Sequence, residues 1–141
     1  MVFKKGFGRT NGTRYNNKKV ENSDGKFDSK KEYQRWLFLK EAEEQGKISN
    51  LQKQVKFELI PPVTEEYVEH LKTKDKVKTR TLQLAITWTA DFVYEKNGET
   101  IVEDVKPSKS LLSDRFVIKE KLFFWKYRKK IRIVVKANEE V

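Results

Sequence analysis

The dipeptide Asn97-Gly98, between two runs of β-forming residues, constrains the fold of this chain most strongly. A two-residue hairpin turn needs φ > 0 at both central positions, and Asn and Gly adopt such angles most readily. With these residues in the turn, Lys96 faces Glu99 and Asp91 faces Asp104. Two carboxylates directly across a strand pair lie about 5 Å apart and repel each other. The hairpin therefore predicts a pair of acids with a cation between them.

Alternation along the strands adds a lysine to this pair. Asp91, Asp104 and Lys106 fall on one face of the predicted hairpin, whereas Glu103 falls on the other. Glu103 is the rival of Asp104 as a ligand, because it also precedes the lysine closely. We prefer Asp104 on the predicted register, and a single β-bulge would reverse that choice.

A first helix is predicted to begin after Ser29. Ser29 and Glu32 have the spacing of a capping box, and Gly46 is a natural end. Glu32 also lies on the same helical stripe as Trp36 and Leu39, so it points toward the core. Two roles for Glu32 stay open. It completes the helix cap alone, or it also serves as a third carboxylate at the acid pair.

The remaining periodicity predicts an α/β fold, a mixed β-sheet flanked by helices. Residues 62–79 are polar and are interpreted as an excursion from the core. A helix before the last strand predicts that this strand runs parallel to residues 100–106. We expect a basic N-terminal arm over residues 1–26 and one folded domain over 27–141. The expected strands and second helix are residues 50–60, 81–95, 99–106 and 130–136, and residues 113–127.

The net charge of +10 is concentrated in three segments. Residues 1–31 carry nine Lys/Arg against three acids, residues 72–80 carry five against one, and residues 119–136 carry eight against one. Such clusters favour a polyanionic partner, most often nucleic acid, with solubility as the alternative. Charge alone does not separate DNA from RNA or an anionic membrane surface. The candidate nucleic-acid contacts are Lys74, Lys76, Lys78, Arg80 and Lys109.

Composition narrows the choice of metal. The chain has no cysteine and one histidine, His70, which excludes thiolate sites and zinc sites with several imidazoles. Oxygen-ligated cations such as Mg²⁺ or Mn²⁺ remain. No apolar run reaches membrane-spanning length, and the first residues lack the apolar core of a signal peptide, so we expect a cytoplasmic protein.

Magnesium is commonly held by one or two carboxylates and keeps several waters. Asp91 and Asp104 supply such a pair, and Glu32 is the candidate third ligand. Lys106 is placed to orient a water or to offset charge on a reacting phosphate. The set predicts metal-dependent phosphodiester cleavage. The alternative is a surface hairpin that carries these side chains without forming a metal or catalytic site.

The aromatic residues near the end of the predicted second helix have two interpretations. They fit a packed core, which we expect, and base stacking is the alternative. These residues are Phe123, Phe124, Trp125 and Tyr127.

Four segments carry a family resemblance: FDSKKEYQRW (27–36), ISNLQKQVKFELIP (48–61), TADF (89–92) and IVEDVKP (101–107). They resemble the PD-(D/E)XK nuclease superfamily. More narrowly, they are similar to small phage-encoded members and to phage endonuclease I-type Holliday-junction resolvases. The resemblance implies a restriction-endonuclease-like fold with Glu32, Asp91, Asp104 and Lys106 as the catalytic set and Gln54 lining the site. Pro107 departs from the glycine that commonly follows the lysine.

The resemblance also implies a function. It points to a Mg²⁺-dependent DNA endonuclease, with Mn²⁺ as a substitute, of a phage or prophage in the bacterial host cytoplasm. Branched recombination or replication intermediates are the implied substrate, and a protein that resolves them is expected to be a homodimer. The alternatives are a non-catalytic basic DNA-binding subunit with a nuclease fold and, less favoured, an RNA-processing nuclease.

Overall fold

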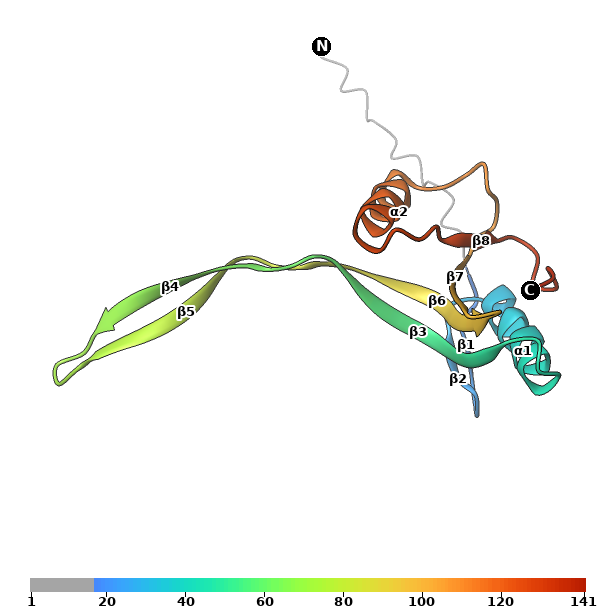
Figure 1. Ribbon diagram of the computed structural model, residues 1–141, viewed down its shortest axis with the longest axis horizontal. Helices are drawn as coiled ribbons and strands as arrows, with labels where there is room; N and C mark the ends of the chain where they lie inside the picture. Colours follow the sequence, from blue (N-terminus) through green and yellow to red (C-terminus); the bar gives the residue numbers. More distant parts are fainter. Residues whose placement is uncertain (1–16) are drawn as a thin grey trace, which may run out of the picture.

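The computed structural model describes residues 17–141 and shows a mixed β-sheet flanked by two helices (Figure 1). The predicted α/β class is therefore confirmed. The elements in chain order are β1 (Val20–Asn22), β2 (Gly25–Phe27), α1 (Lys30–Glu44), β3 (Ser49–Ile60), β4 (Val63–His70), β5 (Asp75–Gln83), β6 (Ile86–Lys96), β7 (Glu99–Val105), α2 (Asp114–Tyr127) and β8 (Arg132–Val134).

The central sheet has four strands in the order β3-β6-β7-β8. Strands β3, β6 and β7 pair antiparallel, and β8 pairs parallel to β7, as predicted from the intervening helix. The last strand is shorter than predicted, because only residues 132–134 pair with β7.

The turn between β6 and β7 has the expected geometry. Asn97 has φ 50° and Gly98 has φ 79°, so both central positions lie in the left-handed region. Lys96 pairs with Glu99 at the turn end, and the register continues unchanged to the pair of residues 92 and 103. The recorded pairing ends there, one position before residues 91 and 104. The sequence-derived register is therefore confirmed over residues 92–103.

The sheet has one hydrophobic core against each helix. Phe92 and Tyr94 belong to the core that contains Leu39 of α1. Val93 and Val102 belong to the core that contains α2 residues. The predicted division of the hairpin into two faces is thus confirmed.

Helix α1 begins as the capping box predicts. The Ser29 side chain accepts a hydrogen bond from the Glu32 backbone N–H at 3.1 Å. Glu32, Arg35 and Leu39 are all buried on the inner side of the helix. The buried position of Glu32 was predicted, whereas that of Arg35 was not.

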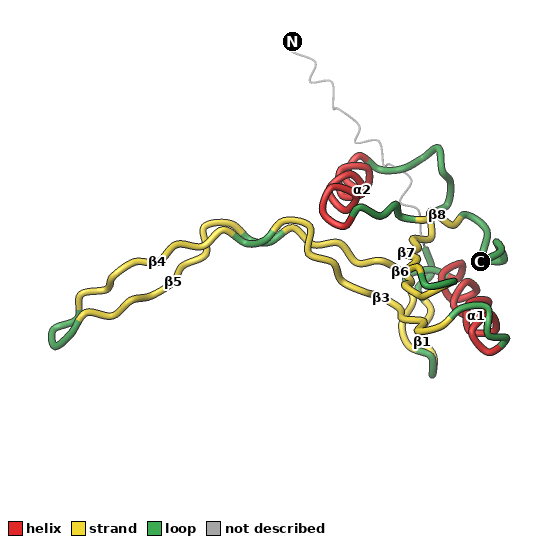
Figure 2. The backbone as a smooth tube through the Cα atoms, viewed as in Figure 1, coloured by secondary structure: helices red, strands yellow, loops and turns green. Residues whose placement is uncertain are grey.

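The predicted excursion after β3 leaves the body of the protein as a two-stranded ribbon of β4 and β5 (Figures 1 and 2). These two strands were not predicted, and residues 81–83 belong to β5 rather than to a single strand over 81–95. Acid–base pairs cross the ribbon, between Glu65 and Arg80 and between Glu69 and Lys78. Such cross-strand pairs support a ribbon that has no core of its own.

Only part of the predicted N-terminal arm, residues 17–26, lies within the described structure. Residues 1–16 of it lie outside the described residues. The strands β1 and β2 form a hairpin, and Phe27 is buried in the α1 core. The folded part therefore begins before residue 27. No helix within residues 17–141 is long and apolar enough to cross a membrane.

Candidate functional site

The two predicted aspartates lie together where β6 and β7 pair. Asp104 is 3 % exposed, and a carboxylate oxygen of Asp91 accepts the Val105 backbone N–H at 2.7 Å. Lys106 Nζ lies 2.6 Å from Asp104 Oδ2. The Lys106 ammonium is therefore the partner of this buried oxygen. The structure brings together three of the predicted catalytic residues.

Burial shapes the charge of this pair. It raises the pKa of Asp91 to about 8, with smaller contributions from the negative charges of Asp104 and Glu32, while the Val105 N–H opposes the shift. Burial also raises the pKa of Asp104, and the Lys106 ammonium opposes that shift. Proton binding is therefore favoured here at neutral pH. A pair of this kind gains from any cation placed between the carboxylates.

Glu32 lies beside the pair but is engaged elsewhere. Its carboxylate accepts the Asp28 backbone N–H at 3.0 Å and the Ser29 hydroxyl at 3.4 Å. Burial is the main cause of its raised pKa, and the charge of Asp104 adds to it. Within the described residues, no three His, Cys, Asp or Glu side chains are grouped closely enough to hold a metal ion. The role of Glu32 as third ligand stays a prediction.

The residues at the pair fit a magnesium or manganese ion. Both side-chain donors are carboxylates, and burial together with their mutual proximity disfavours two uncompensated negative charges. Magnesium commonly takes one or two protein carboxylates and completes its shell with water and phosphate oxygens. Asp91 and Asp104 would hold the ion.

A cavity of about 400 Å³ adjoins Lys106 and Glu32 at the N-terminal end of α1. Lys18, Lys30 and Lys31 also line it, and the sequence interpretation did not include them as site residues. The sequence contained an indication of Lys30 and Lys31, because both lie between the capping residues Ser29 and Glu32. Two lysines in the first turn are unfavourable against the positive end of the helix dipole, unless an anion binds there.

Gln54 falls opposite Asp91 in the register of β3 and β6. Its φ is 53°, an uncommon angle for a non-glycine residue inside a strand. Strict alternation is interrupted here: Ala90 packs with the α2 core, whereas Phe92, two residues on, packs with the α1 core. The Gln54 side chain is exposed, so its predicted place in the site stays a prediction.

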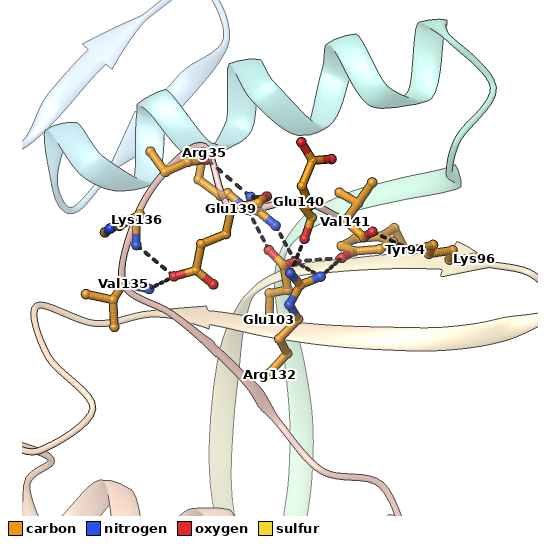
Figure 3. A network of polar contacts seen from close by, with 11 residues as sticks. Arg35, Tyr94, Lys96, Glu103, Arg132, Val135, Lys136, Glu139, Glu140 and Val141 are labelled. Carbon is orange, nitrogen blue, oxygen red and sulfur yellow. Dashed lines mark hydrogen bonds and ion pairs between the residues drawn. The ribbon is translucent and has the colours of Figure 1, made fainter.

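Glu103 alternates with Asp104 along β7 and points toward Arg35 of α1 (Figure 3). Arg35 binds it with two hydrogen bonds of 2.9 and 2.6 Å, and both side chains are fully buried. Tyr94 donates its hydroxyl to the same carboxylate at 2.6 Å, and Arg132 lies 3.5 Å from it. Arg35 also donates to the Ala137 carbonyl at 3.2 Å. This network ties α1, β6, β7 and the C-terminal segment together behind the acid pair.

Four of the five predicted nucleic-acid contacts lie away from the acid pair in the chain. Lys74, Lys76, Lys78 and Arg80 belong to the β4–β5 ribbon, and Lys109 follows β7. Lys78 and Arg80 already pair with glutamates of β4. The ribbon is therefore less basic than its β5 strand alone, and its role in binding stays a prediction.

The raised pKa of Asp91 predicts how metal binding responds to pH. A metal must displace the proton that this carboxyl holds below about pH 8. We therefore expect the affinity for Mn²⁺ to rise about tenfold per pH unit between pH 6 and 8 for one displaced proton. Calorimetric titration with Mn²⁺ at pH 6, 7 and 8 measures this, and an affinity independent of pH would contradict it.

The Asp91 carboxyl is expected to make the stability of the metal-free protein fall with rising pH, whereas the metal affinity rises. Its folded-state pKa lies above the ordinary value of 3.8, so the proton stabilises the fold. That contribution is complete below about pH 4 and is lost as the pH rises through about 8. Mn²⁺ should restore part of the stability lost at pH 8.

Comparison with known proteins gives one family. No curated protein and no solved structure matches the chain. Residues 12–140 match the family described as "Protein of unknown function (DUF1064)". Because this match spans nearly the whole sequence, the chain belongs to the DUF1064 family.

Proposed function

We propose that this protein is a divalent-metal-dependent DNA endonuclease of PD-(D/E)XK type. The observation that carries the proposal is the Asp91–Asp104 pair, with Asp104 buried and Asp91 partly buried, and with Lys106 paired to it and lining a lysine-rich cavity. A purely structural role gives no reason to bury two facing carboxylates, because each raises the cost of charging the other. A phosphodiester beside a bound cation supplies that reason.

The side chains have distinct roles in this proposal. Asp91 and Asp104 hold the cation, which when bound polarises the phosphate and lowers the pKa of a water. Lys106 positions that water or stabilises the negative charge that develops on the phosphate. The lysines at the start of α1 and Lys18 hold neighbouring phosphates of the strand.

The choice of substrate rests on the resemblance of the motifs to resolvases. Branched recombination or replication intermediates of a phage or prophage, in the cytoplasm of its bacterial host, are the proposed target. A four-way junction has two-fold related strands, so a resolvase that cuts both is expected to act as a symmetric homodimer.

The direct test uses fluorescently labelled four-way, flap and linear duplex DNA with Mg²⁺, Mn²⁺ or EDTA. We expect cleavage with either metal, none in EDTA, and faster cutting of the four-way junction than of the linear duplex. Equal cutting of all three would remove the preference for branched DNA. DNA binding without cleavage under any of these conditions would favour the non-catalytic DNA-binding alternative. A labelled RNA hairpin is included under the same conditions, and cleavage of this RNA alone would favour RNA processing.

A further inference from the structure

The aromatic residues near the end of α2 divide into two groups. Phe123 is buried, and its ring lies 5.4 Å from that of Trp88 and 4.9 Å from that of Tyr127. These contacts confirm the expected core role for half of the group. Phe124 and Trp125 instead face outward and are 43 % and 69 % exposed. The core therefore does not account for them.

The outward-facing aromatics border a groove of about 490 Å³. Three cationic side chains line the same groove, accompanied by one acid, Glu120. None of the three forms an ion pair with another described residue. The cations are Lys121, Arg128 and Lys130. Neighbouring Lys126 differs, because it contacts the Glu58 carboxylate at 3.4 Å.

The backbone at Arg128 is a second observation. Arg128 follows the last turn of α2 with φ 56° and ψ 28°, and its N–H donates to the Phe124 carbonyl at 2.9 Å. Glycine is the usual residue in this left-handed position, because a side chain is disfavoured there. The fold alone would be better served by glycine. The arginine instead places a cationic side chain at the edge of the groove.

We propose that this groove binds unpaired nucleotides of single-stranded DNA. A base has an aromatic face that stacks on an exposed Trp or Phe ring, and its phosphates carry the charge that the three cations complement. An uncharged apolar partner would leave these cations desolvated without a counter-charge. Duplex DNA keeps its bases stacked on each other and offers no free face. The combination of ring and cation therefore selects a single strand.

The groove lies on the same helix that borders the candidate active site. Lys106 Nζ lies 4.4 Å from the centre of the Phe116 ring in the first turn of α2. Trp125 follows nine residues later, about 13 Å along the helix axis. Nine residues are about two and a half helical turns, so Trp125 lies on the opposite side of α2 from Phe116, and a single strand reaching both would pass around the helix. Binding at the groove itself needs neither the metal nor the acid pair.

Tryptophan fluorescence tests this proposal on the full-length protein in EDTA. Trp125 is well exposed, whereas Trp88 is 7 % exposed and Trp36 stacks on Phe92, so quenching by a bound base reports mainly Trp125. We expect saturable quenching by oligothymidylate and much weaker quenching by duplex DNA. Trp125→Ala should abolish the quenching and lower the affinity, measured by anisotropy of labelled oligothymidylate, by about tenfold or more.

Two further variants separate binding from folding. Arg128→Gly should raise the melting temperature, because it relieves the left-handed backbone, and yet weaken the binding of oligothymidylate. Lys126→Ala, on the same helix, should leave that affinity unchanged. Equal affinity of Trp125→Ala and the unaltered protein for oligothymidylate would overturn the proposal. Fluorescence changes that depend only on protein concentration would also overturn it, in favour of a second copy in the groove.

These outcomes are independent of the proposed endonuclease activity. Asp104→Asn should retain the quenching by oligothymidylate, because the groove does not use the metal. A protein that binds the single strand at Trp125 but cuts no DNA would support this site and contradict the nuclease. A protein that cuts DNA but whose affinity for oligothymidylate is unchanged by Trp125→Ala would support the nuclease and contradict this site.

Discussion

Asp104→Asn is expected to abolish metal-dependent cleavage while the protein stays folded. The amide keeps the shape of the side chain but removes the negative charge that would hold the cation. Because a bound metal contributes several kcal/mol to such reactions, the single-turnover rate should fall by about 10³-fold or more. Removal of a buried carboxyl with a raised pKa should also leave the melting temperature at pH 8 unchanged or higher.

The same substitution has an informative counterpart in Asp91→Asn. Its side-chain oxygen still accepts the Val105 N–H, so a lost rate would reflect lost charge rather than a broken strand. A variant at either position that cuts as fast as the unaltered protein with saturating Mg²⁺ would contradict the assigned ligand pair.

The second large effect is expected one residue away, at Glu103, and it concerns stability. Glu103→Gln leaves the Arg35 guanidinium fully buried without its counter-charge. Loss of one partner from a buried ion pair typically costs about 3–5 kcal/mol of unfolding free energy. That is a large share of the roughly 5–15 kcal/mol available to a domain. Urea denaturation followed by circular dichroism measures it.

A double variant provides the control. Arg35→Met with Glu103→Leu removes both charges, so it should be clearly more stable than Glu103→Gln alone. A cost below about 1 kcal/mol for Glu103→Gln would contradict the assignment of a tight buried pair. Together the two tests distinguish the adjacent acids: substitution of Asp104 should lower the cleavage rate, and substitution of Glu103 should lower the unfolding free energy.

The features of the fold that were predicted correctly depend on interactions between residues close in sequence. The Asn97-Gly98 turn fixed the hairpin register, and the register alone separated Asp104 from Glu103. The cap at Ser29 likewise located the start of α1. In each case the deciding interaction joins residues close in sequence, so a pattern read over a few positions contains it.

Interactions between distant residues account for what was missed. Arg35 is typical of a solvated helix position, and only Glu103, 68 residues away, explains its burial. The ribbon strands β4 and β5 depend on pairs such as Glu65 with Arg80, which composition does not reveal. The left-handed backbone at Gln54 has no local signal either, because glutamine rarely adopts it.

The projecting ribbon has a practical consequence for measuring the oligomeric state. Eight residues of β4 extend about 26 Å from the sheet, so the molecule tumbles and diffuses as a body larger than its 16.8 kDa. Gel filtration calibrated with spherical standards would overestimate the mass of a monomer and could suggest a dimer. Light scattering or sedimentation equilibrium, which report mass without assuming a shape, is therefore the method that can decide whether the protein is the homodimer expected of a resolvase.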